Sequence, residues 1–229
     1  MRAPAQYVKW VNENLGFNPR SQRNSDALSD FVLADLRAAC PVLDSQLRAG
    51  RVKAAKNMEV FTKVANRNVD LVIFKGEANP TISVLASVEN KTIMAAHGKA
   101  RKNRYGDLIA YANHVHNNRR DCVAAGLLVI NISEAYENPD GFAKGLARNR
   151  FNMEKVVADT IRIFEQTPLR NDAAEPSDQP EALGVIIVDY DGIHPAKLVT
   201  RPPAPQSNSA LHYDSFIRRV SDIYAARCG

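Results

Sequence analysis

Two segments of this 229-residue chain are almost entirely apolar, and they constrain its fold more than any other feature. Residues 123–132 read V-A-A-G-L-L-V-I-N-I, and residues 182–190 read A-L-G-V-I-I-V-D-Y. Apolar runs without polar alternation are typical of strands that are covered on both faces. We therefore expect two buried strands in a central sheet with helices on its faces.

The rest of the chain divides into helical and strand-like segments. Two β-rich runs, 68–75 and 81–91, predict a hairpin whose turn contains Asn79-Pro80. Apolar residues at helical spacing predict the helices. These are expected at residues 4–15, 24–39, 98–117, 140–166 and 211–226, with a short helix at 41–49.

The order of these segments predicts the fold class. Residues 57–64 fit either a strand or a helix, whereas 171–181 and 201–209 are expected to be irregular connections. The alternation of helices and strands favours the α/β (α+β) class, with a mixed central β-sheet flanked by helices. The length, with 45% hydrophobic residues, suits one domain that spans residues 1–229.

Hydropathy and cysteine content indicate the cellular compartment. No apolar run is long enough to cross a bilayer, and the first residues lack the apolar core of a signal peptide. The three cysteines have no metal-ligand spacing, and an odd number suits a reducing compartment. We expect a cytoplasmic protein in which Cys40 and Cys122 are core residues.

Positive charge is concentrated in one segment. Residues 91–120 contain seven Lys or Arg residues and one acid, Asp107, a net charge of +6, whereas the whole chain carries +5. Such a run is either the solvated face of a helix or a surface for a polyanion such as nucleic acid.

Charged side chains also appear in both strands of the predicted hairpin. Asp70 interrupts N-V-D-L-V-I-F-K, and burying a carboxylate there is costly without a partner or a cation. Glu89 and Lys91 end the second strand and, being two residues apart, lie on one face of it. The hairpin can set Asp70 beside them. Two carboxylates and a lysine suit Mg²⁺ binding and phosphodiester hydrolysis.

The pattern of Asp70, eighteen residues, then Glu89-Asn90-Lys91 resembles the core motif of the PD-(D/E)XK nucleases, the restriction-endonuclease-like superfamily. The proline that names the motif is absent, since Val69 precedes Asp70. The resemblance implies a catalytic core over about 24–135, extra N- and C-terminal helices and a C-terminal elaboration over about 182–229.

The resemblance also implies roles for individual residues. Asp70 and Glu89 would bind Mg²⁺, or Mn²⁺ in its place, with the main-chain carbonyl of Asn90 as a further ligand, and Lys91 would belong to the catalytic site. Many members have one more acid upstream of the hairpin. The sequence leaves three choices for it: Asp30, Asp35 and Glu59.

The basic segment is expected to contact DNA. Lys and Arg neutralise phosphates and can read guanine, while Asn can read adenine. The candidates follow the proposed site closely: His97, Lys99, Arg101, Lys102, Asn103 and Arg104. His97, His114 and His116 have no zinc-type partner, so we expect surface polar histidines, with His97 near a phosphate. Asp189 and Asp191 are expected in a turn that ends a strand.

The function that these features favour is a Mg²⁺-dependent endonuclease for double-stranded DNA. The chain has the size of a stand-alone enzyme, and it resembles a type II restriction endonuclease. That resemblance implies a homodimer and a cognate DNA methyltransferase that acts on the same site. The alternatives are a repair, recombination or phage-type nuclease, a non-catalytic DNA-binding protein, or an interaction domain in which Glu89 and Lys91 form a surface ion pair.

Overall fold

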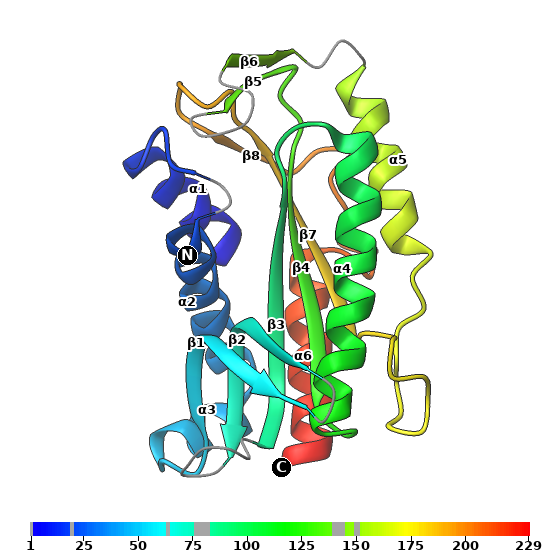
Figure 1. The fold of residues 1–229 in the computed structure, drawn as a ribbon. Coiled ribbons are helices and arrows are strands. Elements are labelled where there is room, and N and C mark those ends of the chain that lie inside the picture. The colour runs from blue at the N-terminus through cyan, green and yellow to red at the C-terminus, as the bar shows by residue number, and fades with distance from the viewer. Residues whose placement is uncertain (1, 19–20, 63–64, 76–82, 139–144, 149–151) are drawn as a thin grey trace.

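A computed structural model describes residues 2–18, 21–62, 65–75, 83–138, 145–148 and 152–229 (Figure 1). Eight strands are described: β1 (Lys53–Phe61), β2 (Asn66–Lys75), β3 (Ser83–Ile93), β4 (Val123–Asn131), β5 (Ala135–Asn138), β6 (Gly145–Arg148), β7 (Ala182–Asp189) and β8 (Lys197–Val199). The helices of the same residues are α1 (Ala3–Glu13), α2 (Gln22–Ala39), α3 (Pro41–Arg48), α4 (His97–Asn118), α5 (Met153–Glu165) and α6 (Tyr213–Cys228).

Six of the strands form one mixed sheet in the order β1-β2-β3-β4-β7-β8. β2 pairs antiparallel with both β1 and β3. β4 pairs in parallel with both β3 and β7, and β8 returns antiparallel to β7. The predicted α/β (α+β) class with a mixed central sheet is confirmed. The described part of residues 182–229 contributes β7, β8 and α6 to this same sheet and core.

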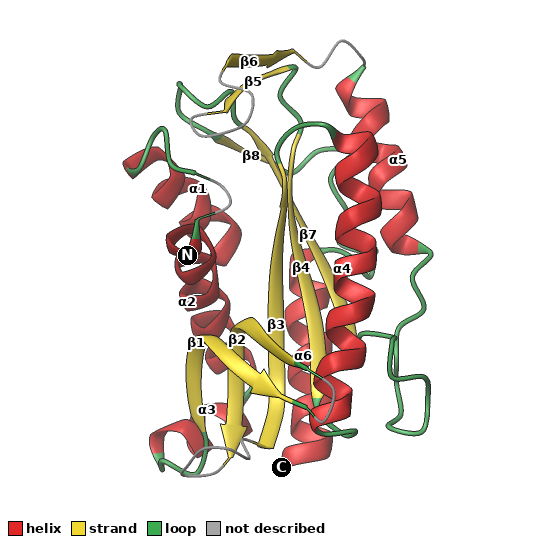
Figure 2. Ribbon diagram, viewed as in Figure 1, coloured by secondary structure: helices red, strands yellow, loops and turns green. Residues whose placement is uncertain are grey.

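Helices cover both faces of the sheet (Figure 2). On one face α1, α2, α3 and α6 bury residues such as Leu28 and Phe216 against β3 and β4. On the other face α4 and α5 bury Leu108 and Phe164 against β4 and β7. The apolar segment that forms β4 is therefore buried along its whole length, as expected for a strand covered on both faces.

Two glycines allow this close packing. A Cβ at Gly126 of β4 would lie 2.8 Å from the Leu108 side chain of α4. A Cβ at Gly184 of β7 would lie 2.8 Å from the Phe216 ring of α6 on the opposite face. A side chain at either position would require Leu108 of α4 or Phe216 of α6 to shift.

Most predicted elements form within a few residues of their expected bounds, including the helix at 98–117, which forms as α4. Residues 57–61 of the ambiguous segment 57–64 belong to strand β1, and residues 63–64 lie outside the described ranges. The single helix expected over 140–166 is wrong: residues 145–148 pair with β5, and α5 begins only after Asn152, whose side chain accepts a hydrogen bond from the Lys155 N–H. The expected turn at Asn79-Pro80 lies outside the described residues.

Three further expectations concern the turn at Asp191, the cysteines and a possible membrane span. Asp191 closes a turn, as predicted, because its carboxylate accepts hydrogen bonds from the N–H groups of Ile193 and His194. Cys40 and Cys122 are buried core residues, also as predicted. No helix in the described ranges has the length and apolar character that a membrane span requires.

Candidate active site

The hairpin of β2 and β3 brings the predicted site residues together. Leu71 lies opposite Val88 in the antiparallel register, and Asp70 and Glu89 come directly beyond this pair. β3 continues past that point because it pairs in parallel with β4 up to Ile93. Asp70, Glu89 and Lys91 therefore lie where the hairpin opens and the parallel part of the sheet continues.

Glu89 is a buried carboxylate, with only 3% of the residue exposed. Its Oε1 accepts hydrogen bonds from Lys91 Nζ at 2.5 Å and from Arg67 Nη2 at 3.0 Å. Its Oε2 is buried and has no hydrogen-bond partner among the described residues. Glu89 and Lys91 do form the ion pair of the alternative interpretation, but its carboxylate is buried, so its placement on the surface is wrong. One oxygen of this carboxylate is held by two cations, and the other is a buried acceptor.

Asp70 is partly buried and turns toward the N-terminal part of α2. Its Oδ1 accepts from Ser25 Oγ at 2.5 Å and its Oδ2 from the Asn90 N–H at 2.8 Å. Burial and the negative charge of Glu89 raise the pKa of Asp70, against the opposing effects of these hydrogen bonds and of Lys91. The negative charge of Glu89 therefore acts on Asp70, and a bound cation would offset this repulsion.

A cleft of ≈ 240 Å³ opens at this point, with the first turns of α2 on one side. Asp70, Asn90, Lys91 and Arg104 all line it. Glu89 is not among the lining residues and lies behind Lys91 on the side of α4, where Arg67 reaches it. The cleft places one carboxylate and two cations, from β2, β3 and α4, around a single opening.

Among the described residues that line the cleft, none is a candidate for the additional acid. Asp30 is exposed and pairs with Lys56 Nζ at 2.6 Å. Asp35 is buried and accepts hydrogen bonds from the Tyr213 hydroxyl at 2.9 Å and from the N-terminal end of α1. Glu59 is exposed on β1. Instead of an acid, α2 presents Ser25 and Ser29 to the site.

The basic segment forms the first turns of α4. Lys99, Lys102 and Asn103 are exposed and available to a partner. Arg104 lines the cleft and pairs with Asp107 at 2.8 Å. Arg101 lines a different cavity, beside α5.

The expectation of surface histidines is wrong for two of the three. His97 and His116 are each only 3% exposed. His97 Nε2 donates to the Asn131 carbonyl at 2.7 Å, and His116 contacts Glu181 at 3.0 Å. Both rings lie in the core because each finds polar partners there.

Arg67 is the most important residue that the sequence did not reveal. It lies three positions before Asp70, yet it reaches Glu89, packs its guanidinium 5.8 Å from the centre of the Tyr111 ring and approaches the Asp107 carbonyl. Residue spacing carries no signal for this role, since the contact depends on how β2 and α4 pack. The contact between Ser25 and Asp70 likewise depends on how α2 packs against the sheet.

The donor set fits a hard divalent cation. Mg²⁺ binds through one or two carboxylates and keeps several waters. Asp70 and Glu89 supply two carboxylates, and the partnerless Oε2 of Glu89 is a buried acceptor of the required kind. No cluster of three or more His, Cys, Asp or Glu side chains with metal-binding geometry occurs in the described parts of the chain. Water and main-chain oxygens would complete such a site.

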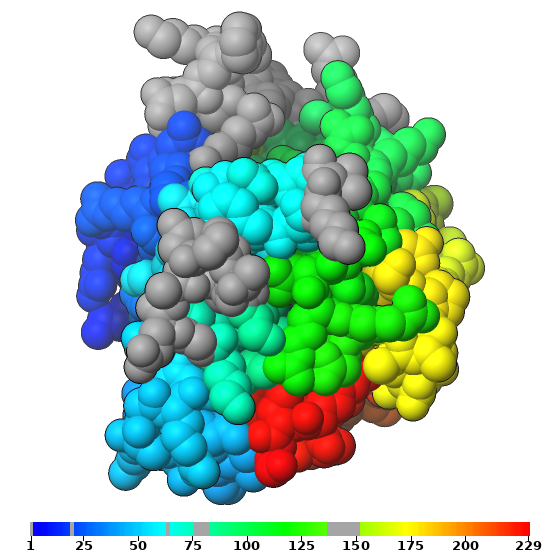
Figure 3. Space-filling model, turned by 60° about the horizontal axis from the view of Figure 1, so that its bottom comes forward, coloured from blue at the N-terminus to red at the C-terminus, as the bar shows by residue number. Residues whose placement is uncertain are grey.

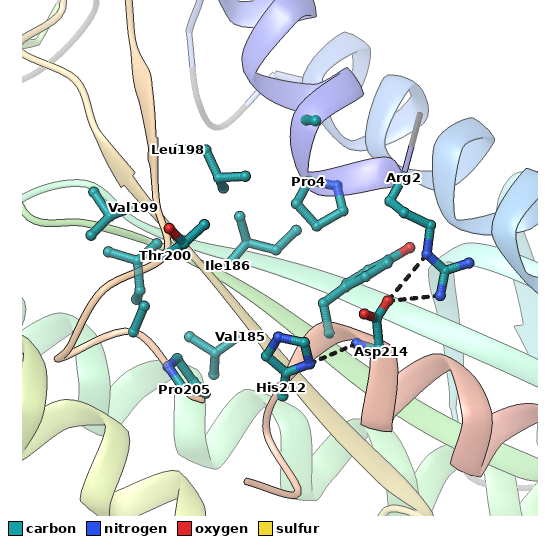
Figure 4. Close-up of a pocket in the computed structure, with 14 residues that line it drawn as sticks. Arg2, Pro4, Val185, Ile186, Leu198, Val199, Thr200, Pro205, His212 and Asp214 are labelled. Atoms are coloured by element: carbon teal, nitrogen blue, oxygen red, sulfur yellow. Dashed lines mark hydrogen bonds and ion pairs between the residues drawn. The ribbon is translucent and has the colours of Figure 1, made fainter. Parts of the chain in front are cut away.

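An apolar cavity of ≈ 190 Å³ lies elsewhere, beside β7 and β8 (Figure 4). Ile186 and Leu198 form part of its wall, and an ion pair between Arg2 and Asp214 borders it at 2.7 Å. Three strands, β3, β4 and β7, separate β8 from β2 in the sheet. This cavity therefore does not belong to the site around Asp70.

Comparison with known proteins adds no identification, because no family model and no curated protein sequence matches this chain.

We expect Arg67→Gln to lower the free energy of unfolding in EDTA by about 2 kcal/mol, because a hydrogen bond to a buried charged group is lost. Mg²⁺ should recover more stability in this variant than in the wild type, since Glu89 then has less positive charge around it. Urea unfolding in EDTA and in Mg²⁺ measures both effects. The control is Arg48→Gln, whose exposed pair with Asp44 contributes little. Equal responses of the two variants would contradict the assigned role of Arg67.

Mg²⁺ is expected to stabilise the wild type but not Asp70→Asn. At a concentration of ten times its Kd, Mg²⁺ should raise the free energy of unfolding by about 1.4 kcal/mol, which corresponds to about 3 to 5 °C in Tm. Folding raises the pKa of Asp70, so its charged form lowers the free energy of unfolding at a pH above the raised pKa. This destabilisation diminishes as the pH falls below the raised pKa and the carboxyl becomes protonated. Asp70→Asn should therefore be at least as stable as the wild type in EDTA at neutral pH. A thermal melt with equal Mg²⁺ shifts in both proteins would exclude Asp70 as a ligand.

Proposed function

We propose that this protein is a Mg²⁺-dependent endonuclease that hydrolyses phosphodiester bonds of double-stranded DNA. The observation that carries the proposal is the pair of carboxylates, Asp70 and Glu89, with Lys91 beside a cleft that the basic helix α4 borders. Paired acids alone would repel phosphate, so their place next to a basic surface makes sense when a cation binds between them.

Each residue then has a role that its contacts support. Asp70, Glu89 and the main-chain carbonyl of Asn90 would hold the ion, which when bound supplies Lewis-acid activation of water and neutralises charge on the phosphate. Lys91 holds Glu89 through its ion pair and lines the cleft, where its ammonium can donate to the attacking water or to a phosphate oxygen. Arg104 adds a second cation on the same cleft.

The order of elements supports the resemblance to PD-(D/E)XK nucleases. A helix precedes the three-stranded antiparallel part, and a helix and a parallel strand follow it, as α2, β1, β2, β3, α4 and β4. Asp70 lies on the second of these strands and Glu89 and Lys91 on the third. Lys99, Lys102 and Asn103, all exposed, would contact the DNA.

Within this class we propose a type II restriction endonuclease that acts in the cytoplasm. It would bind a short duplex site as a homodimer, with a cognate DNA methyltransferase modifying the same sequence. A repair, recombination or phage-type nuclease is the runner-up. A non-catalytic DNA-binding protein is the second candidate function, favoured by the exposed cations on α4.

The proposal is tested by incubating the full chain with long duplex DNA of mixed sequence in Mg²⁺, in Mn²⁺ and in EDTA. Discrete fragments in both metals and none in EDTA are expected of a restriction endonuclease. A metal-dependent smear would move the subtype to a repair or phage-type nuclease. Salt-sensitive DNA binding without cleavage in either metal would support a non-catalytic DNA-binding protein instead.

A further inference from the structure

A cavity of ≈ 430 Å³ lies between the first turn of α4 and helix α5. Gly98, Lys99 and Arg101 line it from α4, and Met153 and Asp159 line it from α5. It is distinct from the cleft around Asp70, with which it shares no lining residue. Nothing in the proposed hydrolysis uses it.

The backbone at this point is arranged as an anion-binding concavity. Ala96 has left-handed dihedrals, φ 51° and ψ 43°, and the right-handed helix α4 follows at once. Consecutive N–H groups in such a left-to-right sequence converge on one point. The first N–H groups of a helix have no partner within it, and α4 has no side-chain cap. The helix dipole adds positive potential at the same place.

A buried side chain gives an independent indication of a ligand. His97 also lines the cavity and is only 3% exposed. Its Nε2 must donate to the Asn131 carbonyl, so the Nδ1 position carries the ring's remaining hydrogen-bonding capacity. Within the part of the chain that the structure describes, this Nδ1 is buried without a hydrogen-bond partner, and so is Nε of Arg101 on the next turn. The Arg101 Nε–H is a donor, whereas Nδ1 of the neutral His97 ring is an acceptor that becomes a donor only on protonation. With His97 protonated, two residues that line the cavity would each offer a donor to an oxygen-rich ligand.

The charges around His97 favour an anion. Lys99 and Arg101 contribute two positive charges from α4. Asp159 of α5 is the carboxylate that lines the cavity, and Lys155 at 2.7 Å and Arg162 at 3.1 Å already neutralise it. β4 contributes only the Asn131 carbonyl, which accepts from the ring. The positive charge that remains is free for a ligand.

We propose that this cavity binds a phosphate group, and that His97 takes up a proton on Nδ1 as the phosphate enters. The imidazolium then donates to Asn131 on one side and to a phosphate oxygen on the other, beside the Arg101 Nε–H and the N–H groups of His97 and Gly98. If the proposed nuclease function is correct, the ligand is a backbone phosphate of the DNA away from the cut. The phosphate site itself does not depend on that function.

Inorganic phosphate and sulfate are the probes, with binding followed by the backbone amide NMR signals of His97 and Gly98. Saturable shifts are expected at constant ionic strength. Sulfate keeps its charge across the range used, so only the protein titrates. Burial lowers the pKa of His97 against the effect of its hydrogen bond to Asn131. Sulfate affinity should therefore rise about tenfold between about pH 7.5 and about pH 5.5 as the imidazolium becomes accessible.

The test variant is Gly98→Asp, with Gly106→Asp as the matched control. Both glycines lie in α4 with open space where a Cβ would be. An acid in the first turn favours the helix, so Gly98→Asp should fold while its carboxylate fills the anion site. Loss of phosphate and sulfate binding in Gly98→Asp alone supports the proposal. Absence of saturable shifts in the wild type, or equal binding by both variants, overturns it.

The source of the phosphate is distinguished with short duplexes. If the ligand is an internal DNA phosphate, Gly98→Asp should lower the affinity for duplexes with and without 5′-phosphates equally. If the site takes a terminal or free phosphate, only the 5′-phosphorylated duplex loses affinity. Either result upholds the site, whereas unchanged affinity for both duplexes together with lost phosphate binding removes DNA as the source. None of these readouts requires cleavage.

Discussion

Glu89→Gln and Asp70→Asn are each expected to reduce Mg²⁺-dependent DNA cleavage by about 1000-fold. Each substitution removes one carboxylate from the pair while keeping the shape of the side chain. Metal stabilisation of transition-state charge contributes several kcal/mol, and about 4 kcal/mol corresponds to this factor. Single-turnover cleavage at saturating protein measures the effect without contributions from product release.

The fold should survive both substitutions. An Asn at position 70 can still accept from the Asn90 N–H and place its amide toward Ser25, and a Gln at position 89 can still accept at Oε1. Glu13→Gln, an exposed acid on α1, is the matched control and should cleave like the wild type. Cleavage within a few-fold of the wild type in either test variant would show that its carboxylate is not a metal ligand.

Glu181→Ala is expected to lower the free energy of unfolding by about 3 to 5 kcal/mol, the usual cost of breaking a buried ion pair. The Glu181 side chain is completely buried, with Arg227 at 2.7 Å, His116 at 3.0 Å and Arg170 at 3.5 Å. Its removal would leave these three side chains without their shared acceptor. Urea unfolding measures the loss, and Glu154→Ala, an exposed acid paired with Arg201, should stay within about 0.5 kcal/mol.

The large loss of stability expected for Glu181→Ala follows from the number of buried groups that contact this carboxylate. Burial raises its pKa, but hydrogen bonds from His116, Arg227 and the Ala124 N–H lower it by more, so the carboxylate stays charged. Arg227 lies near the end of α6, which reaches the surface beside α3 and the C-terminal end of α4 (Figure 3). A loss of less than about 1 kcal/mol in Glu181→Ala would contradict this role as the anchor of α6.

The strands and helices with strong periodicity were predictable because burial and pattern agree there. β4 and β7 are apolar along almost their whole length, so no other placement in a layered fold would bury them. The helix expected over 140–166 failed because apolar spacing continued across Gly145 and Asn152, which belong to a strand and a helix cap. β8 is three residues long and is too short for a pattern to form.

Within the candidate site, the residues on β2 and β3 were predictable because strand alternation fixes their relative positions. Glu89 and Lys91 share a face for that reason. Arg67 and Ser25 were not predictable, since their contacts depend on how α4 and α2 pack against the sheet. The burial of His97 and His116 likewise depends on acceptors, the Asn131 carbonyl and Glu181, that are distant in sequence.

The most direct test of the central claim is plasmid cleavage by the wild type and by Lys91→Ala, in Mg²⁺ and in EDTA. Lys9→Ala, an exposed lysine on α1, is the charge-matched control. We expect cut DNA only with Mg²⁺, from the wild type and Lys9→Ala, with Lys91→Ala inactive but folded. Intact plasmid from the wild type in Mg²⁺, or undiminished cleavage by Lys91→Ala, would contradict a nuclease site at Asp70, Glu89 and Lys91.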